Sequence, residues 1–140
     1  MVTIRAFRPD HLDDLYRICL ETATGGGATA GRDPKLVGHV YAGPYAVLSP
    51  RSVFVVEDGH GVGGYVLGAP DMRRFEARLE AEWWPGLREI YTDPSERPRA
   101  EWSFDQLMIG FVGRNMRHRI KPWETPIQNK RMWRPATTRV

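Results

Sequence analysis

Apolar and polar positions along the first 112 residues predict a strand, two helices, a hairpin, a third helix and a last strand. Residues 2–7, VTIRAF, alternate with the period of two that places apolar side chains on one face of a strand. The runs 52–57 and 65–69 are rich in β-branched and aromatic residues and flank glycine and polar positions, as in a hairpin. The apolar run 106–112, QLMIGFV, predicts the last strand.

Three segments carry the helical spacing of three or four residues, and each starts with an aspartate that can accept hydrogen bonds from the first backbone N–H groups. Asp10 precedes the first segment, Asp33 stands before a proline at the start of the second, and Asp71 precedes the third. The apolar side chains with this spacing are Leu12, Leu15, Ile18 and Cys19, then Leu36, Val37, Val40 and Tyr41, then Met72, Phe75, Leu79 and Trp83. We expect these stripes to face the core.

The glycines Gly59, Gly61 and Gly64 have the spacing GxGxxG of a dinucleotide-binding loop. That fingerprint needs a helix after the third glycine, because the helix N-terminus holds the pyrophosphate. The residues that follow are YVLGA, which favour a strand. The glycines are therefore predicted to turn a hairpin.

Charge divides the chain near residue 112. Residues 113–140 contain eight basic residues and one acidic residue, whereas residues 1–112 contain twelve basic and sixteen acidic ones. The basic part has three prolines and no regular apolar period, so we predict a domain of residues 1–112 followed by a poorly ordered basic tail. The sequence shows neither a secretory leader nor an apolar stretch of membrane-spanning length, which predicts a cytoplasmic protein without a membrane partner.

Three segments resemble the amino-terminal half of the GNAT superfamily of acetyl-CoA-dependent N-acetyltransferases. They read TIRAFRPDHLDDLYRICLETA, DPKLVGHVYAGPYAVLSP and FVVEDGHGVGGYVLGAPDMRRFEARLEAEWWPGLREIY. They are similar to a bacterial subgroup that also resembles the acetyltransferase-like domain attached to some eukaryotic glycoside hydrolases. The resemblance spans residues 3–109 and implies an α+β fold of the three-layer GNAT type. We expect a partial, mainly antiparallel sheet that includes the run 106–112, three helices on its faces, and a sheet left incomplete at the C-terminus.

The resemblance also implies transfer of an acetyl group from acetyl-CoA to an amine on a small molecule or a peptide. GNAT enzymes bind the pyrophosphate of the cofactor at a loop with Arg or Gln, Gly three positions later, and Gly or Ala two positions after that. This pattern occurs nowhere in the 140 residues, so no cofactor-binding residue is predicted. The interpretation is an acetyltransferase relative that is truncated or frameshifted and inactive on its own.

A second interpretation stays open, namely a non-catalytic remnant or binding module. In it, residues 113–140, which include Trp123 and Trp133, contact an acidic partner such as nucleic acid through phosphate neutralisation and stacking. Nucleic acid is the least favoured of these hypotheses. An incomplete sheet would also expose apolar surface near Leu107, Ile109 and Phe111, which predicts self-association.

Candidate substrate-binding residues lie in segments that resemble the acceptor-facing wall of GNAT enzymes: Tyr41, Tyr45 and Asp71. Core packing of the tyrosines and helix capping by Asp71 are competing explanations. No catalytic residue is predicted. Cys19 has no second cysteine and is expected to be a small buried hydrophobic residue. The histidines lack metal-ligand spacing, so no metal site is predicted and surface or capping positions are expected for His11, His39, His60 and His118.

Overall fold

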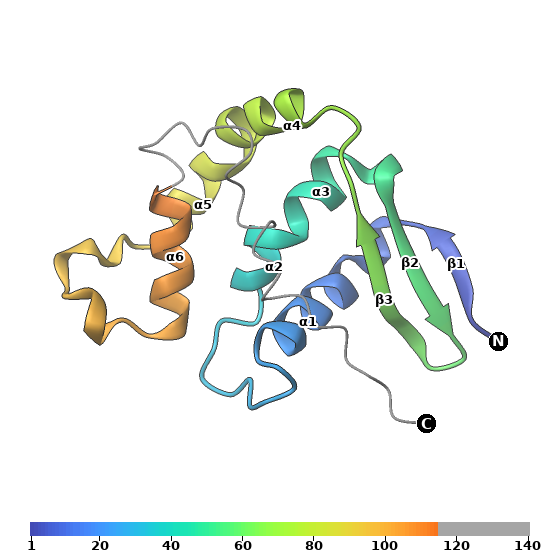
Figure 1. Cartoon of the computed structure of the whole chain (residues 1–140), viewed down its shortest axis with the longest axis horizontal. Coiled ribbons are helices and arrows are strands. Elements are labelled where there is room, and N and C mark those ends of the chain that lie inside the picture. The colour runs from blue at the N-terminus through green and yellow to red at the C-terminus, as the bar shows by residue number, and fades with distance from the viewer. Residues whose placement is uncertain (115–140) are drawn as a thin grey trace.

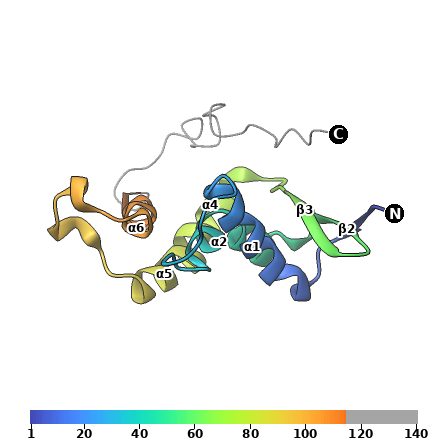
Figure 2. The same cartoon turned by 90° about the horizontal axis from the view of Figure 1, so that it is seen from below.

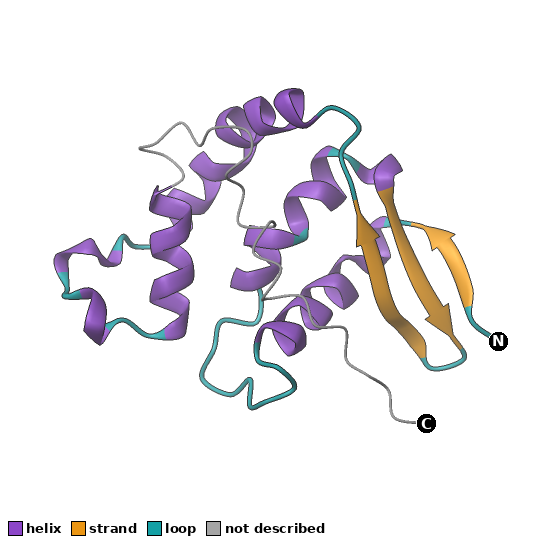
Figure 3. Ribbon diagram, viewed as in Figure 1, coloured by secondary structure: helices purple, strands orange, loops and turns teal. Residues whose placement is uncertain are grey.

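The computed structural model describes residues 1–114, which form a three-stranded sheet and six α-helices (Figures 1 and 3). The strands are β1 (Thr3–Ala6), β2 (Val53–Asp58) and β3 (Gly61–Leu67). The helices are α1 (Leu12–Ala23), α2 (Leu36–Tyr41), α3 (Gly43–Leu48), α4 (Met72–Arg78), α5 (Trp84–Ile90) and α6 (Phe104–Arg114). Within residues 1–114 no helix is both long and apolar enough to cross a membrane.

The sheet is antiparallel, with the strand order β1-β2-β3. β2 and β3 form the predicted hairpin, and Gly61 begins β3 with a φ of +116°, which side chains rarely adopt. The pairing shifts after Val56, so that Glu57 lies opposite Val62. The glycine cluster therefore belongs to a hairpin, and Gly64 lies within β3 and starts no helix.

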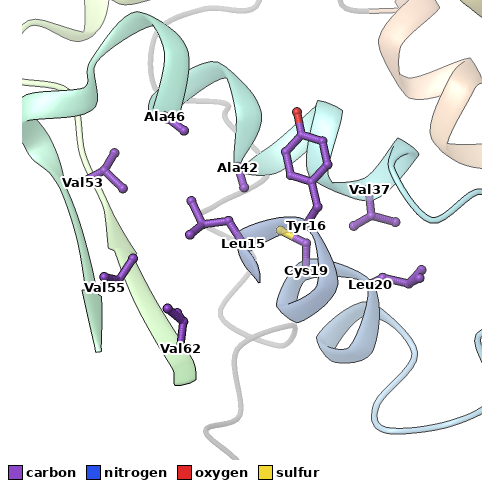
Figure 4. Close-up of a cluster of buried hydrophobic side chains, with 10 residues drawn as sticks. All are labelled: Leu15, Tyr16, Cys19, Leu20, Val37, Ala42, Ala46, Val53, Val55 and Val62. Atoms are coloured by element: carbon purple, nitrogen blue, oxygen red, sulfur yellow. The ribbon is translucent and has the colours of Figure 1, made fainter. Parts of the chain in front are cut away.

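The main core lies between the sheet and α1 (Figure 4). Leu15 of α1 is fully buried and points toward Val53 and Val55 of β2, with Ala42 and Ala46 above it in the view (Figure 4). Other members of this core are Tyr16, Cys19, Leu20, Val37 and Val62. Cys19 is thus a buried apolar side chain, as predicted.

The second predicted helix is divided into α2 and α3. Asp33 caps its start as expected, because its Oδ1 accepts hydrogen bonds from the N–H groups of Lys35 at 2.8 Å and Leu36 at 3.2 Å. The division falls at Ala42, just before Gly43 and Pro44. Pro44 has no N–H to donate into a continuous helix, so a new helix begins there instead.

α5 and α6 form an arm on the side away from the strands, and α4 leads to it from β3 (Figures 1 and 2). A π-helical turn, Leu79–Trp83, joins α4 to α5 just ahead of Pro85. A second core fixes this arm to α2 and contains Leu36, Val40, Trp84, Leu87 and Val112. The arm therefore has its own apolar contacts and does not add to the sheet.

The prediction of a strand at residues 106–112 is wrong, because these residues lie in α6. Ser103 and Gln106 form a reciprocal capping box: the Ser103 Oγ accepts from the Gln106 N–H at 3.2 Å, and the Gln106 Oε1 accepts from the Ser103 N–H at 2.9 Å. A short apolar run has no period that separates a strand from a buried helix. The capping box of Ser103 and Gln106 favours the helix.

Two further predictions change with this result. Leu107 and Ile109 are half-buried on a helix and belong to no sheet edge, so the edge from which self-association was predicted is not formed there. Self-association itself stays a prediction. The count of three helices is also wrong, although the α+β class and the antiparallel sheet are as predicted. The proposed tail, apart from its first two residues, lies outside the described residues.

The start of the first helix also differs from the prediction. Asp10 lies within a 3-10 turn, Pro9–His11, and its carboxylate pairs with the Arg8 guanidinium at 3.0 Å. His11 takes part in the capping, since its Nδ1 accepts a hydrogen bond from the Arg8 N–H at 3.1 Å. Asp10 is therefore an ion-pair partner one turn ahead of α1.

Candidate functional site

Tyr41 and Tyr45 lie four residues apart, at the end of α2 and in α3, and both are half-buried. Tyr45 stacks on Phe75 of α4, with ring centroids 4.5 Å apart and an interplanar angle of 25°. Burial raises the pKa of both hydroxyls, so both remain neutral at neutral pH. Tyr41 packs against both cores. The two residues therefore join helices and leave part of each ring at the surface.

Asp71 is the N-cap of α4, and its Oδ1 accepts a hydrogen bond from the Arg74 N–H at 3.0 Å. Helix capping therefore explains the position of the Asp71 carboxylate. The stacking of Tyr45 on Phe75 brings the helix that Asp71 caps against α3. The structure thus places two of the three predicted residues, Tyr45 and Asp71, on neighbouring elements, while Tyr41 lies at the junction of the two cores.

Cys19 and Tyr65 join α1 to β3. The Cys19 Sγ and the Tyr65 Oη lie 2.8 Å apart, at hydrogen-bond distance. Burial raises the pKa of the thiol and of the phenol. Since the thiolate is the nucleophilic form of cysteine, Cys19 is held in its unreactive form.

His39, for which the sequence predicted a surface or capping position, lies in a half-buried polar cluster. Its Nδ1 lies 3.0 Å from the Tyr16 hydroxyl, and its backbone carbonyl accepts a hydrogen bond from the Trp83 indole at 2.9 Å. Burial lowers the pKa of His39 and raises that of Tyr16 to about 12. Both are neutral at neutral pH, and the tautomer of His39 sets which of the two groups donates the hydrogen bond.

Tyr91 of the arm extends this polar cluster. Its ring centroid lies 6.3 Å from that of His39. Burial and the neighbouring Asp33 carboxylate raise its pKa. The Asp33 N–H in turn donates to Asp105 of α6 at 2.8 Å. The cluster therefore connects α1 and α2 to the end of α5 and to α6.

An open cavity of about 240 Å³ lies between α1 and the loop before α2. Its lining mixes charges and apolar atoms: Asp13, Tyr16, Arg17, Leu20, Glu21, Thr29, Pro34 and Lys35. Arg17 is already engaged, because its guanidinium contacts Asp14 and Glu21 and donates to the Val62 carbonyl at 2.8 Å. The Tyr16 hydroxyl is directed to His39. The cavity therefore contains no pair of nucleophile and base at hydrogen-bond distance.

The described residues do not fit the pyrophosphate of acetyl-CoA. Such a group needs converging backbone N–H groups at a helix N-terminus without competing negative charge. α1 begins with Asp13 and Asp14, and α6 begins with Asp105 after the Ser103 cap. Within residues 1–114, carboxylates thus occupy the start of each α-helix longer than one or two turns. No groups of three or more potential metal ligands lie together in the same residues.

No protein-family model matches the chain. Among curated proteins, Protein O-GlcNAcase of the rat, Rattus norvegicus, and of the mouse, Mus musculus, are each 35% identical to it over 94 residues. This match covers 66% of the chain and 10% of each relative, so the chain spans about a tenth of the length of these relatives. The solved structure of SsHAT has a TM-score of 0.69 and 34% sequence identity, over 83% of this chain and 57% of that one.

These similarities agree with the arrangement of strands and helices and define a GNAT-like acetyltransferase fold. The chain is thus a relative of the GNAT acetyltransferases with an incomplete α+β fold. The resemblance predicted from its three segments is confirmed.

Proposed function

We propose that this chain is the acceptor side of an acetyl-CoA-dependent N-acetyltransferase and that it has no turnover by itself. The observation that carries the proposal is the structural similarity to SsHAT over 83% of the chain. The acceptor would be an amine on a small molecule or a peptide, and Tyr41, Tyr45 and Asp71 would line its approach. The location we propose is the cytoplasm.

Acetyl transfer to an amine requires a base that removes the ammonium proton before attack. The described residues supply only weak candidates for this base. Burial leaves Tyr16, Tyr41 and Tyr45 as neutral phenols, and His39 Nδ1 is engaged with Tyr16. These assignments support a chain that holds an acceptor without activating it.

Cofactor affinity is the most direct test. Each charge-assisted hydrogen bond to a phosphate contributes on the order of 1.5–3 kcal/mol. The lack of about three or four such hydrogen bonds therefore weakens the binding of acetyl-CoA by several powers of ten. We therefore expect a dissociation constant for acetyl-CoA no better than roughly millimolar. Any remaining affinity that depends on arginine side chains alone should fall with added salt.

Titration calorimetry of the whole 140-residue chain with acetyl-CoA measures this affinity, with SsHAT as the positive control. A parallel assay follows release of the free thiol of coenzyme A with amine acceptors. No heat at micromolar cofactor and no thiol release are the expected results. A low micromolar dissociation constant would contradict the proposal of an inactive chain and would place a phosphate site in residues 115–140.

The second candidate function is a binding module, and the observation that favours it is the excess of basic residues in 113–140. Its partner would be acidic, and single-stranded nucleic acid is the probe that Trp123 and Trp133 suit, because bases stack on indole rings. Fluorescence anisotropy with a labelled oligonucleotide tests it. Affinity that falls steeply with salt and disappears on deletion of residues 115–140 would support the module; equal affinity without these residues would contradict it.

A further inference from the structure

Two charged side chains that line the cavity beside α1 have no ionic partner. Arg17 and Glu21 also line it, but they pair with each other, and Arg17 contacts Asp14 as well. The other two charges are Asp13 and Lys35, and within residues 1–114 neither makes an ion pair. The cavity therefore presents one negative and one positive charge that a ligand can neutralise.

These two charges lie toward opposite ends of the cavity. The helices α1 and α2 run in opposite directions, and Val37 of α2 lies on the side of Leu20, near the end of α1 (Figures 1 and 4). Lys35 directly precedes α2 and is therefore on that side as well, whereas Asp13 lies in the first turn of α1. Since seven residues of an α-helix rise about 10 Å, the backbone positions of the two charges are separated by about that length along the cavity.

The surface between the two charges is apolar. Leu20 and Pro34 line the cavity there, and the Tyr16 ring adds to them because its hydroxyl is engaged with His39 at 3.0 Å. The volume of about 240 Å³ is smaller than the roughly 300–1,000 Å³ of pockets for drug-sized ligands. The lining therefore suits a small molecule with a hydrocarbon chain and a charge at each end.

The loop that forms the second wall of the cavity is fixed from its other side by α6. The guanidinium carbon of Arg32 lies 4.0 Å from the centre of the Phe104 ring, and the Asp33 N–H donates to Asp105 at 2.8 Å. Asp33 also caps α2. These contacts hold the next two residues of the loop, which line the cavity, so less order has to be imposed when a ligand binds.

We propose that this cavity binds a small ω-amino carboxylate, which has an ammonium group at one end of a short hydrocarbon chain and a carboxylate at the other. The ammonium contacts Asp13, the carboxylate contacts Lys35, and the chain packs against Leu20 and Pro34. An α-amino acid carries both charges on one carbon, so it reaches only one of the two charged residues. None of the three predicted acceptor residues lines this cavity, so the inference is independent of the proposed function.

A ligand with a single charge would gain much less. Asp13 and Lys35 are both exposed, and an exposed ion pair contributes little by itself. When both partner charges belong to one molecule, the second contact forms within a complex that already exists and needs no further loss of translational freedom. The zwitterion should therefore bind more tightly than either of its halves.

NMR titration of the backbone amides of the complete 140-residue chain tests this inference. The probe is δ-aminovalerate, with pentylamine and valerate as analogues of one charge and free glycine as a zwitterion of the shortest length. We expect a dissociation constant of about 0.1–1 mM for δ-aminovalerate and values at least about tenfold higher for the other three compounds. The amide signals that move should be those of residues 13–21 and 29–35.

Two substitutions remove one charge each at an exposed position. Asp13→Asn should weaken the binding of δ-aminovalerate at least about fivefold without weakening that of valerate, and Lys35→Gln should do the same without weakening that of pentylamine. Glu89→Gln and Arg51→Gln are the matched controls, because these charges are exposed but do not line the cavity, and they should leave all four affinities unchanged. Circular dichroism verifies that each variant retains the fold.

The proposal is overturned if δ-aminovalerate moves no amide signal at about ten times the weakest expected dissociation constant, or moves only signals outside the cavity. Equal affinity for pentylamine or valerate would mean a site for a single charge, and equal affinity for free glycine would mean that the charges need not be separated. Either result contradicts the proposed class of ligand. Unchanged affinity of Asp13→Asn or Lys35→Gln for δ-aminovalerate would contradict the contacts assigned to these side chains.

Discussion

Gly38 and Gly43 allow α1 to lie directly against α2 and α3, because a Cβ at either position would collide with the Tyr16 side chain. The Tyr16 ring occupies the space that a side chain at residue 38 would need, since a Cβ there would lie 2.4 Å from it. Real Cβ atoms do not approach so closely, so a larger residue must displace the ring from the core.

We expect Gly38→Ala to destabilise the protein by about 1–3 kcal/mol, because overpacking outweighs the gain in helix propensity. Urea unfolding followed by tryptophan fluorescence measures this. Gly86→Ala is the matched control, as it lies in α5 and a Cβ there would meet no atom within 4 Å, and it should stabilise by roughly 0.5–1 kcal/mol. An unchanged midpoint for Gly38→Ala would mean that Tyr16 is not held as described.

His39 makes stability depend on pH. Burial lowers its pKa in the folded chain, the Asp33 carboxylate opposes this shift and Lys35 adds to it. Below the ordinary histidine value of 6.5 the unfolded chain therefore binds a proton that the folded chain does not. This contribution is complete above that pH and is lost as the pH falls through the folded pKa.

His39→Asn should consequently flatten the decline of the urea midpoint between about pH 7 and pH 5. His60→Asn, at an exposed histidine of the hairpin, is the control and should leave the slope as in the unmodified chain. If the slope of His39→Asn equals that of the unmodified chain, the Tyr16–His39 pair is not the source of the pH dependence.

At the scale of elements, α6 depends on its first turn. Ser103 and Gln106 satisfy each other's backbone N–H groups, and Gly110 lets the Trp102 ring approach, since a Cβ there would lie 2.5 Å from it. The pattern Ser-x-x-Gln is a helix-start signal that stands in the sequence. It is the signal that distinguishes this helix from the strand expected at residues 106–112.

Ser103→Ala should cost about 0.5–2 kcal/mol and increase hydrogen exchange in α6, because the Gln106 N–H loses its acceptor. Ser103→Thr keeps the hydroxyl and should retain most of the stability. Amide exchange of residues 104–110 measured by NMR reports the effect on this helix alone. Exchange in Ser103→Ala equal to that of the unmodified chain would contradict the capping box.

At the scale of the whole molecule, two cores hold residues 1–112 together. One lies between α1 and the sheet, and the other between α2, α5 and α6. The prolines, charge and lack of periodicity of the last residues predict that they add little to either core.

Deletion of residues 115–140 should therefore leave the thermal midpoint nearly unchanged. Differential scanning calorimetry of the shortened and complete chains, at equal concentration and salt, makes the comparison. A drop of several degrees would show that these residues cover apolar surface, and the face of Ile4, Phe54 and Val66 would be the first place to look.

The sequence by itself determined the elements with strong local signals. Alternation and glycine turns specified β1 and the β2–β3 hairpin, and aspartates at helix starts specified α2 and α4, because these signals act within a few residues. The similarity to GNAT acetyltransferases could also be predicted, because it lies in the amino-acid sequence of three long segments.

Only the tertiary structure decided what lies far apart in the chain. The pairing of Tyr16 with His39, the stacking of Tyr45 on Phe75 and the burial that sets their pKa values join residues 23 and 30 positions apart, which no local period encodes. The same holds for QLMIGFV, whose apolar run suits a strand or a helix until its partners are known. Likewise, only the structure brings Ile4, Phe54 and Val66 together on one face of the sheet, because cross-strand register is set by the fold.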